Sequence, residues 1–477
     1  MESQPASPNV APSSVSSCAT DRVPLPQKLA IGVGGFPFFT SSMVVQYMAQ
    51  PIYQIVLGLN PLLFGIAMTI PRVWDAFSDP IMGSISDNFR SRYGRRRPFV
   101  FVGAILSGIG FAAIWMVPRG WSEGAMFSYL VAASLFYFTA TTIFAVPLTS
   151  LSFEMTPDYH ERTRVMAFWG FFATVGNFAI NWYAPATHWS IFSDPLEGAR
   201  WVGAFIGLFV FAGMGVIPAL FTRERFYATA QTQAKIGLFT AVRQAGSSQP
   251  MMMLVGLLLA LNFCGSIAGS LAQYIVIYHV CAGDIARGLY LNALNGTGFA
   301  IVGFAFIPVI TWLSNRLGKR RAMFTVLGMA TLGGFSKWFI FTPDHPYLLL
   351  LDAVLNGPIW VALGVMVPSM LADLCDYDEL RYGQRREGVI SAVFTWITKL
   401  GLSLTFLFSG IALTVSGFSE KLGLAQPEGT LTKMRLLFTG SSVLAPLLGL
   451  LCLVFYTITE KRAREIRAEL EARRGKV

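Results

Sequence analysis

Twelve stretches of apolar residues alternate with short polar loops along the chain. They cover residues 29–57, 61–83, 98–117, 125–150, 165–188, 199–220, 250–279, 288–314, 322–341, 346–373, 388–415 and 432–457. An α-helix needs roughly 20 apolar residues to cross the hydrocarbon core of a bilayer, and each stretch supplies about that number. The pattern therefore predicts an all-α membrane protein with about twelve transmembrane helices.

The composition agrees with a membrane protein, since 54% of the 477 residues are hydrophobic and only 13% are charged. The formal net charge of +10 comes from basic residues that lie beside apolar stretches, where the positive-inside rule places them. We therefore expect a lipid bilayer as partner and no nucleic acid. The sequence has no nucleotide-binding glycine loop, catalytic-triad spacing or metal-ligand cluster. We expect no enzymatic activity, no cofactor and no metal other than a transported ion.

Basic residues concentrate in the loops that follow the even-numbered stretches. They include Arg90, Arg92, Arg162, Arg164, Arg223, Arg225, Arg381, Arg385 and Arg386, and near the C-terminus Lys461, Arg462, Arg464 and Arg467. Because positively charged loops stay on the cytoplasmic side of the membrane, both termini are predicted to be cytoplasmic. We expect a monomeric, multi-pass protein of the cell inner membrane.

A short basic turn occurs twice in the sequence. Gly94 to Arg97 follows the second stretch, and Gly318 to Arg321 follows the eighth. Its recurrence at corresponding places implies two six-helix halves related by duplication, as in many alternating-access transporters. The residues expected to act in gating are Asp87, Arg95, Arg96, Arg97, Arg316 and Arg320.

This duplication predicts how the chain is divided. The expected segments are a disordered cytoplasmic tail over 1–24, an N-terminal bundle over 25–221, a cytoplasmic linker over 222–249, a C-terminal bundle over 250–457 and a basic cytoplasmic tail over 458–477. Within the linker, the apolar residues 236–242 predict a short interfacial helix.

Three ionisable residues, Arg72, Asp75 and Asp79, lie inside the second apolar stretch. A charge at the centre of a membrane helix costs about 2.5 to 3.5 kcal/mol on insertion scales, so such residues face protein or water. Asp75 and Asp79 are four residues apart and share one helix face, with Cβ atoms about 5 to 6 Å apart. Two carboxylates that close either hold a cation or share a proton, which correspond to sodium and proton coupling.

A purely structural role is the alternative for these aspartates. Asp75 would pair with Arg72, and Asp79 would cap backbone groups near Pro80. That arrangement leaves the second carboxylate without a counter-charge in a place where an unpaired charge is costly, so we favour a cation site. Lys399 lies near the middle of the eleventh stretch and is a candidate counter-charge.

Two further charged residues are embedded in apolar stretches. Lys337 and Asp352 lie in the ninth and tenth stretches, nearer their outer ends. For these residues we expect exposure to lipid headgroups or to a cavity.

Several segments carry a resemblance to a known family. They are Arg72-Val73-Trp74-Asp75-Ala76-Phe77-Ser78-Asp79-Pro80, Arg92-Tyr93-Gly94-Arg95-Arg96-Arg97-Pro98-Phe99, Thr156-Pro157-Asp158-Tyr159-His160-Glu161-Arg162-Thr163-Arg164, and the stretch from Asp373 through Lys399. The chain resembles the glycoside-pentoside-hexuronide:cation symporters of the major facilitator superfamily, the relatives of melibiose permease. The resemblance implies the major facilitator fold, with two pseudo-symmetric six-helix bundles, and sodium- or proton-coupled symport by alternating access.

The resemblance also implies roles for individual residues. Asp75 and Asp79 match the two cation-binding aspartates of the family, and Thr142 matches a helix-four threonine near the same cation. Lys399 matches a helix-eleven lysine implicated in coupling, in which we also expect Arg72 to take part. Ser78 stands where sodium-coupled carriers have an asparagine, and its hydroxyl offers the ion an oxygen.

Positions that hold the sugar in melibiose permease differ in this chain. Phe39 and Ala145 stand in place of aspartates, and Gly170 stands in place of an arginine. We therefore expect a sugar or glycoside other than a melibiose-like galactoside, with a lysolipid or other amphipathic solute as the alternative. The residues expected to face the solute cavity are Gln46, Tyr47, Trp169, Asn177, Gln273, Asn292, Trp360 and Trp396, although helix packing is the ordinary role of such side chains.

Overall fold

The computed structural model describes residues 22–156, 159–223, 248–382, 387–418, 422, 426–427 and 429–474. Within these residues the regular secondary structure is entirely helical. This agrees with the predicted all-α class.

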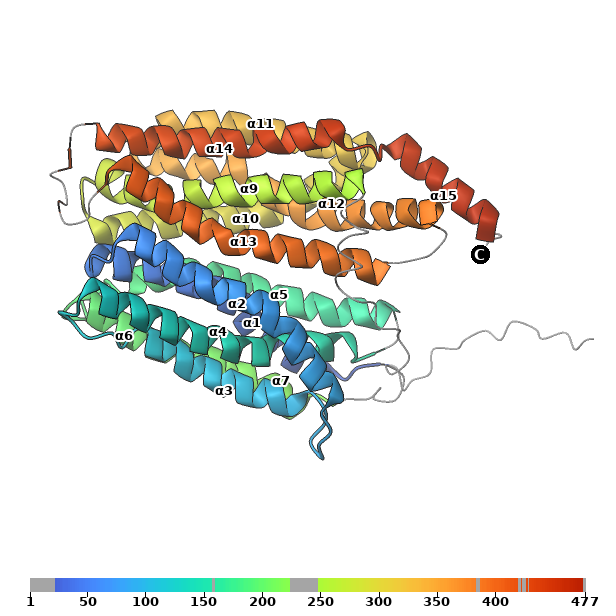
Figure 1. The fold of residues 1–477 in the computed structure, drawn as a ribbon, viewed down its shortest axis with the longest axis horizontal. Coiled ribbons are helices and arrows are strands. Elements are labelled where there is room, and N and C mark those ends of the chain that lie inside the picture. Colours follow the sequence, from blue (N-terminus) through green and yellow to red (C-terminus); the bar gives the residue numbers. More distant parts are fainter. Residues whose placement is uncertain are drawn as a thin grey trace, which may run out of the picture.

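The helices fall into two groups that follow each other in the sequence. The N-terminal group contains α1 (Leu25–Ala49) and its π-helical continuation η2 (Gln50–Val56), α2 (Pro61–Asn88), α3 (Arg97–Ile114), α4 (Glu123–Phe153), α5 (Tyr159–Ala186), and the rod formed by α6 (Pro195–Phe205), η3 (Ile206–Met214) and α7 (Gly215–Phe221). The C-terminal group contains α9 (Gln249–Tyr274) with η5 (Ile275–Val280), α10 (Ile285–Leu317), α11 (Lys319–Ile340), the 3-10 turn η6 (Pro346–Leu350) with α12 (Leu351–Tyr382), α13 (Glu387–Ser416), α14 (Thr430–Phe455) and α15 (Glu460–Arg474). Figure 1 shows the C-terminal group above the N-terminal group.

The long helices, together with their π-helical or 3-10 continuations, correspond to the predicted apolar stretches. Ten of those described are long and apolar enough to cross a membrane. The other two, α2 and α5, have 28 residues each, but α2 is more polar because Arg72, Asp75 and Asp79 lie in it. The rods therefore match the expected two groups of six.

Short polar residues mark where several helices begin. At the start of α2, the Asn60 side chain accepts hydrogen bonds from the N–H groups of Leu62 and Leu63, at 2.9 and 3.4 Å. Asp194 and Asp284 cap α6 and α10 in the same way. These side chains pair amide groups that have no acceptor within their own helix, which stabilises the helix start.

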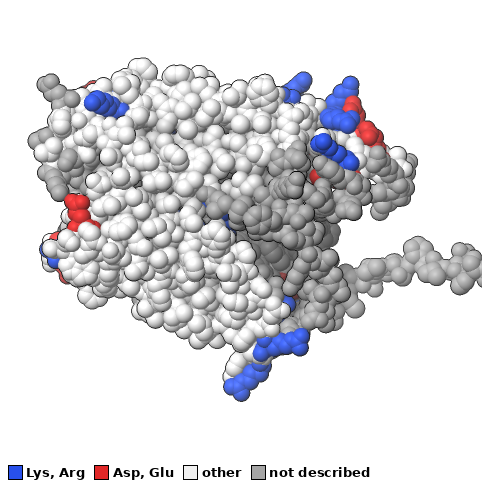
Figure 2. Space-filling model, in the orientation of Figure 1, with Lys and Arg blue, Asp and Glu red and all other residues white. Residues whose placement is uncertain are grey.

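The two halves are joined at the end of the molecule opposite to α15. There α2 and α13 pack so closely that a side chain at Gly410 would clash with the backbone of α2. The Tyr274 hydroxyl donates to Gln54 Oε1 at 2.8 Å, and Gln50 Nε2 donates to the Ser270 carbonyl at 3.2 Å. Figure 2 shows a broad face of described residues between the two ends of the molecule with few Lys, Arg, Asp or Glu side chains. The described halves are thus held together at this end of the bundle.

Both ends of the described chain pack against the bundle. Val23 is buried, and its N–H donates to Glu161 Oε1 at 2.9 Å, so the packed chain begins before the end of the predicted 1–24 tail. The predicted basic tail contains α15, which contacts α12 and buries Ile466 and Leu470. Residues 1–21 and the helix predicted at 236–242 lie outside the described residues.

Candidate cation and solute site

The charged face of α2 is directed at α4 and α13. Asp75 Oδ1 and Asp79 Oδ1 lie 3.5 and 3.1 Å from one atom, Thr142 Oγ1 of α4. A single hydroxyl reaches both carboxylates because these lie on one helix face, as their four-residue spacing predicted. The aspartate side chains are 20% and 23% exposed, so the pair is neither enclosed nor fully solvated.

Hydroxyl groups form a short chain beside the aspartates. Thr142 donates to Asp79, the nearer carboxylate. Ser78 Oγ lies 3.3 Å from Thr142 Oγ1 and donates to the Asp75 carbonyl at 3.5 Å. Ser78 and Thr142 are both buried. The structure therefore brings together the four oxygen-bearing side chains that were predicted around the cation.

The counter-charge for Asp79 comes from the other half of the molecule. Lys399 of α13 places its ammonium group on Asp79 Oδ2, so the predicted counter-charge does reach the pair. Hydrogen bonds between two ionised groups are among the strong ones. The Lys399 side chain is nevertheless 47% exposed, so its ammonium is held by Asp79 without being enclosed.

Arg72 lies beside the other aspartate. Its Nη1 is 3.8 Å from Asp75 Oδ2, and its Nη2 donates to the Ser42 carbonyl of α1. The guanidinium lies 4.5 Å from the ring centre of Phe138 and 5.9 Å from that of Phe406 in α13, as cation–π contacts require. Two aspartates are thus balanced by two cationic side chains. Asp79 pairs with lysine instead of capping backbone, so only half of the structural alternative is realised.

The predicted cavity residues are not all brought to one place. Gln46 lines a small hollow between the halves, together with Gln50 and Ser270. Tyr47 and Trp360 are exposed at 45% and 51%. Partial burial is shared by Asn177, Gln273 and Asn292. The side chain of Trp396 lies outside the described residues.

Trp169 is buried among apolar side chains of the described residues. It is 9% exposed, and its ring packs on that of Phe38 with centroids 5.0 Å apart. Its neighbours in the buried cluster include Leu148 and Val165. Trp169 therefore packs against its neighbours in this structure, and its assignment to the solute cavity stays a prediction.

The two basic turns make corresponding contacts in the two halves. Arg97 donates two hydrogen bonds to backbone carbonyl groups at the end of α7, and Arg320 donates two at the end of α14. The acceptors are Ala219, Leu220, Leu453 and Val454, at 2.7 to 3.2 Å. Arg97 and Arg320 therefore occupy corresponding places in the two halves. An alignment of Gly94 with Gly318 would instead match Arg97 with Arg321, so the two turns are offset by one residue.

The residue before each of these arginines pairs with an acidic residue on the fourth long helix of its half. Arg96 lies 3.0 Å from Glu154 beside α4, and Lys319 lies 2.7 Å from Asp373 of α12. Arg95 also contacts Glu154, at 2.8 Å. No role was predicted for either acid, although both lie at the ends of corresponding apolar stretches, the fourth and the tenth.

Two other predicted gating residues, Arg316 and Asp87, do not appear among the contacts described for the two basic turns. The guanidinium of Arg316 lies 5.2 Å from the ring centre of Trp312, on its own helix. The side chain of Asp87 lies outside those that the structure describes. Their assignment to gating stays a prediction.

Lys337 and Asp352 form a buried ion pair, and the predicted exposure was wrong. Their charged atoms are 3.5 Å apart, and the side chains are only 11% and 6% exposed. Asn356 donates to the same aspartate oxygen at 2.7 Å, and Lys337 lies 4.9 Å from the ring centre of Phe438. Packing of α11 against α12 buries these charges, which their positions near the ends of the stretches did not reveal.

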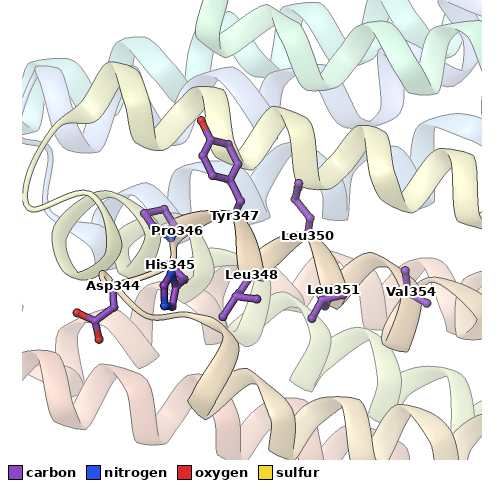
Figure 3. A pocket seen from close by; sticks show the side chains of 8 residues that line it. All are labelled: Asp344, His345, Pro346, Tyr347, Leu348, Leu350, Leu351 and Val354. Atoms are coloured by element: carbon purple, nitrogen blue, oxygen red, sulfur yellow. The ribbon is translucent and has the colours of Figure 1, made fainter.

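A separate hollow lies on the outer part of the C-terminal half. It is formed by the short segment from Asp344 to Val354, around η6 and the start of α12. Figure 3 shows Tyr347 and Leu350 pointing to one side of this segment and Leu348 to the other. The hollow includes none of the predicted site residues.

A match that covers most of the chain identifies its family. Residues 30–460 match the family described as MFS/sugar transport protein. The chain belongs to this family. It is therefore a multi-pass transporter of the major facilitator type, as the resemblance of its motifs implied.

Several relatives are similar over nearly their whole length. An uncharacterised symporter of Synechocystis sp. is 25% identical over 96% of this chain and 98% of its own. The sodium-dependent lysophosphatidylcholine symporter 1 of Gallus gallus is 24% identical, with 94% and 90% covered. The isoprimeverose transporter of Lactiplantibacillus pentosus is 22% identical, with 98% and 95% covered. These relatives are transporters.

A solved structure has the same fold. The bacterial homologue of the human lysosomal transporter Spinster superposes with a TM-score of 0.66. Its sequence is 14% identical, and the match covers 93% of this chain and 97% of that one. The similarity extends across both halves, which agrees with the predicted two-bundle architecture.

Proposed function

We propose that this major facilitator protein carries a sugar or glycoside across the membrane together with a sodium ion or a proton, by alternating access. It works as a monomer in the cell inner membrane, with both termini in the cytoplasm and no cofactor. The observation that carries this proposal is the pairing of Lys399, from one half, with the two-aspartate site of Asp75 and Asp79 in the other.

The coupling ion binds among the oxygen atoms of Asp75, Ser78, Asp79 and Thr142. Thr142 Oγ1 lies within 3.5 Å of an oxygen of each aspartate, and 3.3 Å from Ser78 Oγ. Carboxylate and hydroxyl oxygens are suitable ligands for a hard cation such as sodium. A proton on either carboxylate relieves the same repulsion between them. One site therefore serves for either ion.

Lys399 provides the means of coupling. Its ammonium occupies one oxygen of Asp79, so a cation that binds to both aspartates competes with it. Two positive charges next to one carboxylate repel each other, and cation binding therefore favours release of Lys399. Since Lys399 belongs to α13 and Asp79 to α2, this release changes a contact between the halves, which alternating access requires.

The membrane potential supplies sufficient driving force. One monovalent cation that moves down a potential of 100 mV releases about 2.3 kcal/mol. This free energy corresponds to roughly fifty-fold accumulation of a neutral solute. Symport of one cation with one sugar is therefore energetically adequate.

A lysolipid is the second candidate solute. It is favoured by the similarity to the lysophosphatidylcholine symporter over 94% of this chain. The apolar side chains Phe39 and Ala145, at positions where melibiose permease has aspartates, suit an acyl chain better than a row of hydroxyl groups. In this case the cation site would keep its role, and only the solute would differ.

Uptake into proteoliposomes tests these alternatives. The purified protein is supplied with isoprimeverose or lysophosphatidylcholine under an inward sodium gradient, an inward proton gradient or no gradient. We expect accumulation of isoprimeverose only with one of the ion gradients, and the Asp79→Asn variant run in parallel should abolish it. Ion-driven uptake of lysophosphatidylcholine alone would favour the second candidate. Uptake that ignores both gradients would overturn symport.

A further inference from the structure

One part of α10, at the junction with the N-terminal half, carries polar groups that the cation site does not use. Gly296 lies against the carboxamide of Asn181 in α5, and Trp182 Nε1 donates to Thr297 Oγ1 at 3.1 Å. Since α5 and α10 belong to different halves, the halves meet here. Asn292 lies one helical turn before Gly296, on the same side of α10.

Two amide groups on this part of α10 are buried without a partner. Asn292 Nδ2 and Asn295 Oδ1 are shielded from solvent, and neither has a hydrogen-bond partner among the described residues. The first atom is a donor and the second is an acceptor. Buried polar groups nearly always have a partner, so two such atoms three residues apart need an explanation.

Other asparagines of the bundle show what an ordinary partner would be. Asn181 Nδ2 donates to the carbonyl of Asn177, and Asn262 Nδ2 donates to that of Leu258, each at 2.7 Å and one turn back in its own helix. Asn292 does not make this local bond. Its donor therefore has no partner within its own helix.

We propose that Asn292 and Asn295 form a subsite that hydrogen-bonds the hydroxyl groups of the transported solute. A sugar hydroxyl both donates and accepts, and it complements one unpartnered donor and one unpartnered acceptor. An acyl chain has no such groups. The subsite rests on the proposed symport function and assigns it a polyhydroxylated solute. Because the same part of α10 contacts Asn181 of α5, a solute bound there lies where both halves act on it.

Leucine replacements test the subsite. Asn292→Leu and Asn295→Leu keep a similar side-chain volume and remove the polar groups. Isothermal titration with isoprimeverose should give a Kd about two- to twelve-fold higher for each variant, as expected for loss of one hydrogen bond. The Tm without solute should stay equal or rise, because an unpartnered buried amide has been removed. Sodium binding should be retained, since the proposed ion ligands lie on α2 and α4.

Asn262→Leu is the matched control. Its amide is already paired within α9, so the affinity for isoprimeverose should not change. Native affinity in both α10 variants would overturn the subsite and leave the proposed function standing. A native protein that binds no isoprimeverose and no other glycoside would overturn the carbohydrate form of the proposed function, and the subsite with it. If a leucine variant does not fold, the alanine variant at the same position is measured in its place.

Discussion

Lys399 of the C-terminal half places its ammonium group on the carboxylate of Asp79 of the N-terminal half. Both residues lie within helices of membrane length, α13 and α2. The pair therefore links the halves at the site proposed for the coupling ion. Ion binding at this site and movement of the two halves relative to each other therefore depend on each other through this contact.

Lys399→Gln should separate cation binding from solute accumulation. Without the competing ammonium, we expect the sodium affinity in the absence of solute to rise about tenfold, which corresponds to 1.4 kcal/mol. Accumulation against a solute gradient should be lost, because cation binding no longer alters a contact between the halves. Sodium titration in detergent and vesicle uptake measure the two effects.

The control for this lysine is Lys319→Gln. Lys319 pairs with Asp373 in the basic turn, away from the cation site, and its replacement should leave sodium affinity unchanged. An unaltered sodium affinity in Lys399→Gln, together with normal accumulation, would refute the competition.

Asp75→Asn and Asp79→Asn should each abolish ion-driven accumulation while solute exchange continues. Each change removes one of the two carboxylates that are proposed to bind the ion. Thr142→Ala should weaken ion affinity less, since it removes a neutral oxygen. The measurement is uptake against an imposed gradient, with Asp284→Asn, at the start of α10, as the control. Normal accumulation in both site variants would make the aspartates structural.

Arg95 and Arg96 should substitute for each other in the basic turn. Both contact Glu154, at 2.8 and 3.0 Å, so either single alanine variant should transport at close to the native rate. The double variant should be slowed several-fold with its solute affinity retained, because the turn lies outside the proposed binding sites. Exchange rates and equilibrium binding test this. Arg92→Ala, in the same loop, is the control, and equal losses in the single and double variants would contradict the shared contact.

Asp352→Asn should destabilise the protein by about 3 to 5 kcal/mol, because it leaves the charge of Lys337 buried without its partner. The double variant Lys337→Met with Asp352→Asn should recover most of this loss, since no charge then remains buried. Thermal unfolding in detergent measures both, and a double-mutant cycle isolates the coupling. Strictly additive effects would show that the two residues do not interact.

The membrane orientation is tested with a reporter fused after Val477. The basic loops that follow even-numbered stretches predict a cytoplasmic C-terminus, so a reporter that is active only in the cytoplasm should be active there. A reporter that is active only outside the cytoplasm should be silent. The opposite pattern would reverse the proposed topology.

The apolar stretches predicted most of the fold, and the cost of charge in a membrane predicted the centre of the site. That cost restricts where Asp75, Asp79 and Lys399 can lie, so their proximity could be inferred without knowing how the helices pack. Thr142 came only from the resemblance to a family, because one threonine among many apolar helices has no signal of its own. Its distances to both aspartates now supply that signal.

Other features depended on contacts between helices that the order of residues does not reveal. Lys337 and Asp352 lie near the ends of their stretches, where exposure is usual, yet α11 and α12 bury them against each other. Glu154 lies just after an apolar stretch, and nothing in the sequence showed that it forms ion pairs with Arg95 and Arg96. The burial of Trp169 against Phe38 was likewise not evident from the sequence, because the chemical character of a residue does not specify the helix face on which it lies.

The contacts of Arg97 and Arg320 are made with backbone carbonyl groups and not with side chains. Every residue type supplies a carbonyl, so the exposed acceptor residues Leu220 and Val454 can vary in evolution without loss of these bonds, whereas Ala219 and Leu453 are constrained by burial. The two arginines cannot vary in this way, because lysine offers a single ammonium in place of a planar fork that reaches two acceptors. Among orthologues, variation should therefore accumulate at positions 220 and 454 while both arginines are retained.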